Sequence, residues 1–250
     1  NLYIDNNITQ LTTLNLSGFS RLKNEPYLVP IKTKHYNSYI KDTIRFIAHA
    51  GGAIDNQTYT NSLEALNHNY KKGFRLFELD IRKTSDNKFV AVHYWGEWAE
   101  RTGFKGSLPP THQDFLQYKI QSKYTPLDME SINDWFKLNK DAILITDKIN
   151  TPRAFSNSFI DKDRLIMELF TWEAVIEGLA CKIKSSMPSQ RVLLSFKPED
   201  VVAKFKAQGI TDVALSRYNL SKEIDLIKEL KQNGIKVYLY NIEDFNEISA

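Results

Sequence analysis

Short apolar runs alternate with amphipathic stretches from residue 44 to near the end of the chain. The short runs are rich in Val, Ile, Leu, Phe and Tyr, which is typical of β-strands. In the longer stretches apolar residues recur every three or four positions, which indicates helices that bury one face. We therefore expect strands at 45–49, 76–81, 89–94, 142–149, 165–170, 192–196, 212–216 and 236–242.

The helices expected between these strands carry end signals. The stretch 62–73 follows Asn61, a possible N-cap, and ends at Gly73. Two later helices end at Gly209 and Gly234, as glycine readily adopts the left-handed backbone that terminates a helix. These two helices are expected at 198–209 and 221–234, and two others at 128–138 and 171–183.

This alternation predicts an α/β protein with a TIM (β/α)8 barrel. An open doubly wound sheet is the alternative, but "HAGGA" at 49–53 is not followed by a complete G-x-G-x-x-G fingerprint. We expect residues 1–43, which are polar and weakly patterned, to form an N-terminal arm or linker. The barrel should then occupy 44–250, with an ordered insertion at about 95–125, a segment longer than most loops.

Composition narrows the class of protein. The net charge is only +3 and no dense basic run occurs, which argues against nucleic acid as a partner. The single cysteine, Cys181, excludes an intramolecular disulfide and a cysteine-rich zinc site. No segment approaches the roughly 18 apolar residues of a membrane span, which argues against stable membrane insertion. Nothing in the pattern indicates an oligomeric state.

The chain begins at Asn1 rather than Met, which indicates a processed or trimmed chain. On this basis an extracytoplasmic location is favoured over a cytoplasmic one.

Ionisable residues gather where the predicted strands end. Glu78 and Asp80 are two apart, so on a strand they point to the same face, where unpaired carboxylates are costly to bury. Each of these residues alone could have an ordinary structural role, and Glu168 could be a site acid or simply end a strand. In a barrel, however, all strand ends meet at the rim that carries catalytic groups. The ionisable strand ends are His49, Glu78, Asp80, His93, Asp147, Lys148 and Glu168.

These residue types suit one kind of chemistry. Glu78, Asp80 and Asp147 supply the oxygen ligands that Mg²⁺ or Ca²⁺ prefers. Two histidines, His49 and His93, could act as general acid and base. Lys148 could neutralise an anionic oxygen. Together, the three acids, the two histidines and this lysine favour cleavage of a phosphodiester.

The segments that carry these residues resemble the glycerophosphodiester phosphodiesterase family, within the phosphatidylinositol phospholipase C-like phosphodiesterases. The most specific part is 76–103, with E-x-D at Glu78 and Asp80 and His93 fifteen residues after Glu78 (93 − 78). Other matching segments are "AHAGG", "YTNSLEAL", "ITDKI" and "GIKVYLYNI".

The resemblance implies a TIM barrel, one divalent cation (Mg²⁺ or Ca²⁺) and a small phosphodiester substrate. His49 and His93 would be the catalytic pair, and Glu78, Asp80 and Asp147 the metal ligands. The substrate-binding residues would be Lys148, Trp95 and Tyr240, although the insertion's aromatic rings could equally serve packing.

Several positions depart from the family pattern. Ala50 replaces the arginine after the first histidine, and Tyr94 replaces the aspartate after the second. Asp147 stands where a glutamate is usual, and Tyr240 where a tryptophan is usual. The family's last strand is missing near Ala250, so barrel closure should be irregular.

We therefore expect a divergent member whose substrate is a glycerophosphodiester or a related alcohol or sugar phosphodiester. The alternatives are a phosphomonoesterase, a non-catalytic barrel that binds sugar phosphates, and a phospholipase-like lyase at a membrane surface.

Overall fold

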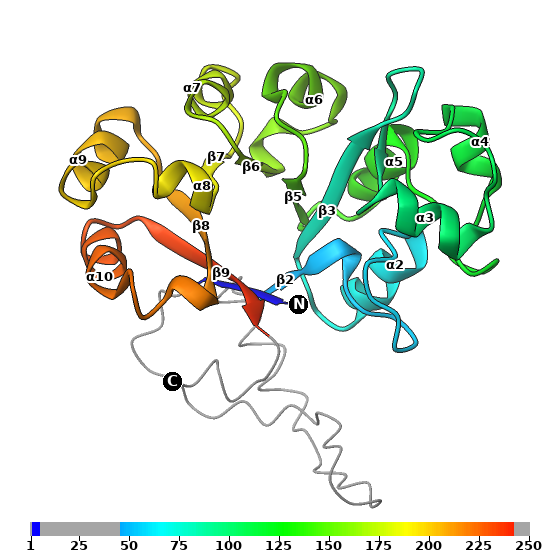
Figure 1. The fold of residues 1–250 in the computed structure, drawn as a ribbon, viewed down its shortest axis with the longest axis horizontal. Helices are drawn as coiled ribbons and strands as arrows, with labels where there is room; N and C mark the ends of the chain where they lie inside the picture. The colour runs from blue at the N-terminus through cyan, green and yellow to red at the C-terminus, as the bar shows by residue number, and fades with distance from the viewer. Residues whose placement is uncertain (1, 6–45, 243–250) are drawn as a thin grey trace, which may run out of the picture.

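The computed structural model describes residues 2–5 and 46–242. Eight strands surround one interior, and helices lie outside them (Figure 1), the arrangement of an α/β barrel. Around the sheet the order is β7-β6-β5-β3-β2-β1-β9-β8, and β7 and β8 lie side by side. Their bounds are β1 Leu2–Asp5, β2 Phe46–Ala48, β3 Leu76–Lys83, β5 Ile143–Asp147, β6 Leu165–Leu169, β7 Ser185–Pro188, β8 Asp212–Ser216 and β9 Lys236–Ile242.

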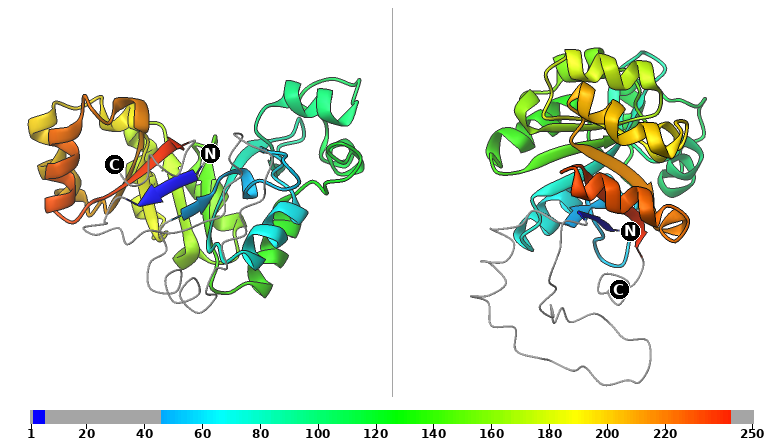
Figure 2. Two further views of the ribbon diagram at one scale, coloured as in Figure 1. Left: turned by 90° about the horizontal axis from the view of Figure 1, so that it is seen from below. Right: turned by 90° about the vertical axis from the view of Figure 1, so that its left-hand side faces the viewer.

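Strand β1 completes the barrel in an unusual direction. It pairs antiparallel with β2 on one side and with β9 on the other, whereas the other neighbouring pairs around the described sheet are parallel (Figure 2). The described part of the 1–43 arm is therefore a barrel strand. The rest of that arm, and 243–250, lie outside the described residues.

Two of the predicted strands were wrong. Only Phe89–Ala91 of the predicted 89–94 is a strand (β4), and it pairs antiparallel with the end of β3 as a hairpin beside the barrel. The predicted strand at 192–196 begins inside helix α8 (Gln190–Leu193), and β7 lies earlier. A short apolar run cannot by itself be assigned to strand or helix. The polar serines of β7 did not indicate a strand. The Ser186 hydroxyl donates to Val175 O on helix α7 (Trp172–Ala180), at 2.7 Å.

The main helices lie near their predicted positions. Helix α2 begins after Ser62, whose side chain accepts from Ala65 N, so the predicted N-cap at Asn61 was wrong by one residue. Helix α9 ends at Gly209, with φ +72°, as predicted. The helices are α2 Leu63–Lys71, α3 Trp95–Thr102, α4 His112–Gln117, α5 Met129–Leu138, α6 Pro152–Ser158, α7 Trp172–Ala180, α8, α9 Pro198–Gln208 and α10 Ile224–Gln232, with short 3₁₀ turns at His49–Gly51, Lys162–Arg164 and Arg217–Asn219. Of these helices, none is long and apolar enough to cross a bilayer.

Three apolar clusters hold the structure together. The largest lies between the strands and the outer helices. A second holds together the insertion, whose helices α3 and α4 lie to one side of the barrel (Figure 1). The third is a small cluster within the barrel, made by Ile47, Leu76, Ile145, Ile166, Met187, Ala214 and Tyr238.

The strand register carries the acids toward the same interior. Leu76 of the inner cluster lies on β3 two residues before Glu78 and four before Asp80, so all three share one face. Glu78 is paired with Ile145 and Asp80 with Asp147 on the neighbouring parallel strand. The acids therefore lie above the inner cluster, toward the carboxyl ends of the strands.

Gly178 of α7 provides a test of this packing. A Cβ added there would lie 2.5 Å from Ser186 Oγ and 3.0 Å from Leu169 Cδ1. We expect Gly178→Ala to lower the free energy of unfolding by about 1–3 kcal/mol in urea titration. Gly96→Ala is the matched control: it lies in α3 with open space around it, and should raise stability by about 0.5–1 kcal/mol. Equal stability of Gly178→Ala and the wild type would contradict the assignment of β7.

Candidate functional site

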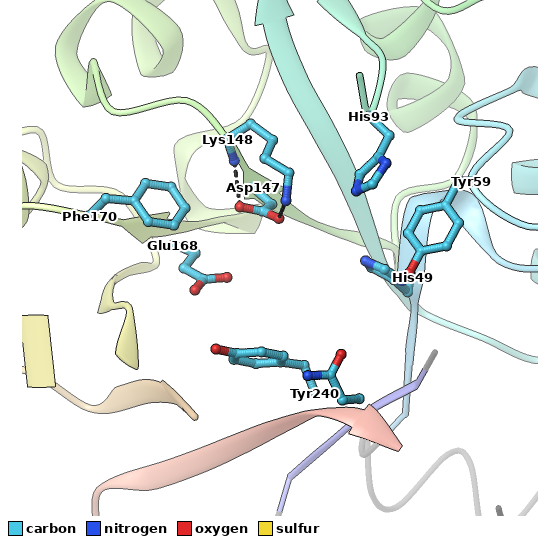
Figure 3. Close-up of a pocket in the computed structure, with 9 residues that line it drawn as sticks. His49, Tyr59, His93, Asp147, Lys148, Glu168, Phe170 and Tyr240 are labelled. Carbon is cyan, nitrogen blue, oxygen red and sulfur yellow. Dashed lines mark hydrogen bonds and ion pairs between the residues drawn. The ribbon is translucent and has the colours of Figure 1, made fainter. Parts of the chain in front are cut away.

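A pocket of about 240 Å³ opens at the carboxyl ends of the strands (Figure 3). The two imidazoles and Tyr59 lie on one side of it, and Glu168 and Phe170 lie on the other. Its lining residues are His49, Tyr59, His93, Asp147, Lys148, Glu168, Phe170, Tyr240 and Asn241.

Glu78 lies buried beneath this pocket with only half of its carboxylate satisfied. Its Oε2 accepts a 2.6 Å hydrogen bond from Ala50 N, and His49 Nε2 is 3.6 Å from the same oxygen. The turn after β2 makes this contact possible because Ala50 adopts a left-handed backbone, with φ +52°. The other oxygen, Oε1, is buried without a hydrogen bond.

Asp80 has a similar imbalance. The side-chain amide of Asn61 holds both the side chain and the backbone of Asp80. Asn61 Nδ2 donates to Asp80 Oδ2 at 2.9 Å, and Asp80 N donates to Asn61 Oδ1 at 3.0 Å. Asp80 Oδ1 is buried without a hydrogen bond, and Lys148 Nζ lies 3.5 Å from it. Buried polar atoms in proteins are nearly always paired, so two such carboxylate oxygens indicate a place for a positively charged ligand.

Asp147 is held by the residue that follows it. Lys148 adopts a left-handed backbone (φ +67°), its N–H donates to Asp147 Oδ1 at 2.5 Å, and its ammonium contacts Asp147 Oδ2. The same ammonium is paired with Asp80, so it links the two carboxylates. Burial opposes the charge of Lys148, but Asp147 and then Asp80 outweigh burial and raise its pKa above its ordinary value.

The interior holds more negative charge than its partners balance. Burial raises the pKa of Glu78 well above its ordinary value of 4.5, and the charges of Asp80 and Asp147 raise it further. Burial and then Asp147 also raise the pKa of Asp80, despite the bond from Asn61. Burial, and then the charge of Asp147, also raises the pKa of Glu168 well above its ordinary value. These are the conditions under which a divalent cation stabilises a site.

The donor atoms fit such a cation. One ligand atom from each of His49, Glu78 and Asp80 can be chosen so that all lie within 4.8 Å of one another. Two carboxylates suit Mg²⁺ or Ca²⁺, and an imidazole is compatible with a transition metal. Asp147, the predicted third acid, is not in this closest set, and its oxygens are engaged by Lys148.

The two histidines differ in environment. Burial, with the nearby positive charge of Lys148, lowers the pKa of His49 to about 3, so its imidazole is neutral at pH 7. His93 Nδ1 donates to Glu97 Oε2 at 3.1 Å, and Arg101 Nη1 donates to the other oxygen of Glu97 at 3.1 Å. Tyr59 lies between the imidazoles, with ring centroids 4.9 Å from His49 and 4.5 Å from His93.

The structure brings together nearly all of the sequence-predicted site residues. Only Trp95 lies elsewhere: it is not among the pocket residues, and its ring packs edge to face on Trp98 and Phe115. A packing role rather than a substrate contact fits this placement. The sequence-predicted residues at the pocket or directly beneath it are His49, Glu78, Asp80, His93, Asp147, Lys148 and Tyr240.

Sequence reasoning missed several residues of the site. Glu97 follows His93 by four residues, a helical spacing that would have indicated the contact if α3 had been predicted to start at Trp95. Asn61 was noticed only as a helix cap. Tyr59 and Asn241 lie in the matching segments "YTNSLEAL" and "GIKVYLYNI" but were given no role, and Phe170 carried no signal.

No family model matches the chain, and no curated protein matches it either. The chain is similar in fold to solved structures of glycerophosphodiester phosphodiesterases. One from Parabacteroides distasonis is 18% identical (TM-score 0.62; 81% of this chain and 86% of that chain covered). One from Thermotoga maritima is 16% identical, with a TM-score of 0.60, and the match covers 76% of this chain and 84% of that chain. A phosphodiesterase of Oleispira antarctica, in complex with the product sn-glycerol-3-phosphate, is 15% identical. Its TM-score is 0.59, and the match covers 79% of this chain and 84% of that chain. At these identities the likeness establishes the fold.

The clamp from Asn61 predicts how the site binds metal. Asn61→Ala should weaken divalent-cation binding by about 10- to 100-fold, because groups that orient a ligand typically contribute that much. The measurement is the cation concentration that half-saturates the rise in melting temperature. The neighbouring cap variant Ser62→Ala should lower stability by about 0.5–2 kcal/mol without this shift. An equal half-saturating concentration for Asn61→Ala and the wild type would argue against Asp80 as a ligand.

Proposed function

We propose that the chain is a divergent glycerophosphodiester phosphodiesterase that hydrolyses a glycerophosphodiester or a related alcohol or sugar phosphodiester. The observation that supports this most is the placement of two buried, unpaired carboxylate oxygens beside two imidazoles and one ammonium, at the catalytic rim of a barrel. The shared fold with solved phosphodiesterases supports the same reaction.

Glu78 and Asp80 would hold the divalent cation, for which Mg²⁺ and Ca²⁺ remain the proposed identities. When bound, the cation would stabilise negative charge on the phosphoryl oxygens. We keep Asp147 as the proposed third ligand because it is paired with Asp80 in the sheet and already shares a positive charge with it through Lys148. His49, whose Nε2 is 3.6 Å from Glu78 Oε2, lies beside the same place.

Lys148 would contact the phosphate. Its raised pKa keeps the ammonium charged across the physiological range, and its exposed side chain fraction of 24% leaves it accessible from the pocket. Asp147 and Asp80 hold this ammonium at the floor of the site, so it need not be ordered when substrate binds.

The two histidines would transfer the protons. His49 is neutral, so its lone pair can accept the proton of the attacking hydroxyl, which comes from water or from the substrate itself. His93 would protonate the leaving alcohol. Its Nδ1 is engaged by Glu97, which leaves Nε2 for the transfer and fixes the plane of the ring.

The charge of the pocket favours a diester over a monoester. Among its lining residues, all described, Lys148 is the one Lys or Arg, and Ala50 stands where the family has arginine. A phosphomonoester carries nearly two negative charges at pH 7 and a diester carries one. We therefore rank the phosphomonoesterase and the non-catalytic sugar-phosphate barrel below a diesterase.

Location outside the cytoplasm stays a prediction.

Two substrates separate the two proposed histidine roles. A nitrophenyl diester has a leaving group that departs without protonation, whereas an alkyl diester such as glycerophosphoethanolamine needs an acid. We expect His49→Ala to lower kcat on both by about 10²–10⁴, and His93→Ala to do so mainly on the alkyl diester. Chelation by EDTA should abolish both activities.

His112→Ala is the control, because His112 lies in the insertion, bonded to Asp128 at 2.9 Å, and does not line the pocket. It should retain the wild-type rates. Full activity of the wild type in EDTA, or of His49→Ala on both substrates, would refute the proposal.

A further inference from the structure

Glu168 is a buried carboxyl that the proposed reaction does not use. It lies at the end of β6 with 6% of its surface exposed, and it lines the pocket. Within the described residues it has neither a hydrogen bond nor an ion pair. Figure 3 shows its carboxylate directed into the pocket, across from His49 and His93. A buried carboxylate without a partner is costly, so a ligand group at this place would be strongly favoured.

Two aromatic rings accompany this carboxyl. Phe170 follows it by two residues and lines the same side of the pocket. Tyr240, from β9 across the barrel, lies beneath Glu168 in Figure 3, and its phenol is close enough for the charge of Glu168 to act on it. A carboxylate bordered by aromatic rings is the arrangement that binds alkylammonium groups, through charge pairing and cation–π contact.

The charges of the site point to the same ligand class. Four carboxyl groups, of Glu78, Asp80, Asp147 and Glu168, converge on one interior. Lys148 balances one of them, and a divalent cation would balance two more. The remaining carboxyl is Glu168, which lies on the side of the pocket away from the closest metal-ligand set. The phosphodiester brings further negative charge. When Glu168 is ionised in the substrate complex, the group that balances it is therefore a positively charged part of the substrate rather than the phosphate.

We infer that Glu168, Phe170 and Tyr240 form a subsite for a quaternary ammonium group on the leaving alcohol, the chemistry of a choline ester. This inference rests on the proposed function for the phosphate half of the pocket. The ammonium group would lie against Glu168 while the phosphate lies beside Lys148, on the histidine side. The barrel interior thus selects the alcohol by its charge.

A matched pair of esters isolates the charge. Glycerophosphocholine and the 3,3-dimethylbutyl ester of glycerol phosphate have the same shape, but the second carries carbon in place of the ammonium nitrogen. We expect wild-type kcat/KM to favour the choline ester at least 10-fold, and Glu168→Gln to bring the ratio near one. Phe170→Leu should reduce the ratio several-fold. Glu199→Gln, an exposed acid in the first turn of α9, should keep the wild-type ratio.

A binding arm makes failure of the inference distinguishable from failure of the proposed function. Choline phosphate and 3,3-dimethylbutyl phosphate are titrated calorimetrically into the metal-loaded wild type and Glu168→Gln. Absence of hydrolysis of both esters would refute the phosphodiesterase, yet the binding preference for choline phosphate and its loss in Glu168→Gln would still support the subsite.

Three results would overturn the subsite. One is a wild-type ratio near one in both arms. The second is an equal loss for the two esters in Glu168→Gln, which would make Glu168 a general support of the site or a proton donor to a hydroxyl. The third is a higher metal requirement in Glu168→Gln with an unchanged ratio, which would make it a ligand of a second cation.

Discussion

The crowding of carboxylates inside the barrel is the constraint on which the rest of the site depends. Glu78 and Asp80 point inward from one strand, and Asp147 and Glu168 join them from the next two. The protein balances this charge only in part. The groups that do so are the backbone N–H groups of Ala50 and Lys148, the side-chain amide of Asn61 and the ammonium of Lys148. Glu78 Oε1 and Asp80 Oδ1 are buried without hydrogen bonds. A barrel interior that holds so much negative charge is understandable as a receptor for positive charge, both metallic and organic.

The backbone around the pocket is shaped to deliver these contacts. Ala50, Tyr59, Asn61, Lys148 and Asn241 all have positive φ angles, a conformation that costs side-chain-bearing residues free energy. Each is at the pocket or contacts an acid beneath it. Such strain persists where the surrounding structure imposes it, and here it turns an N–H, an amide and an ammonium toward the acids. Ala50, where the sequence resemblance leads one to expect an arginine, contributes through its backbone N–H, which donates to Glu78.

The sequence predicted the fold class and most of the residues that converge on the pocket, but not all of the strands that carry them. Glu78 and Asp80 were found because carboxylates within an apolar strand are costly to bury unless they bind a positive group, and His49 and His93 because they end apolar runs. The count of eight strands was right although two of its members were wrong. The runs 89–94 and 192–196 were apolar but lie outside the barrel sheet, whereas β1 and β7 lie in polar sequence. The strand character of β1 and β7 comes from pairing with distant segments, which local pattern does not reveal.

Proton release on metal binding is the most direct test of the charge imbalance. At pH 6 an ordinary glutamate, with a pKa of 4.5, is already ionised, and His49, with a pKa of about 3, is neutral. We therefore expect protons released at that pH to come chiefly from the acids whose pKa is raised, Glu78 and Asp80. Titration calorimetry of Mg²⁺ or Ca²⁺ in buffers of different ionisation enthalpy counts these protons. The account predicts that one cation binds and that protons are released, whereas binding without proton release, or no binding, would contradict it.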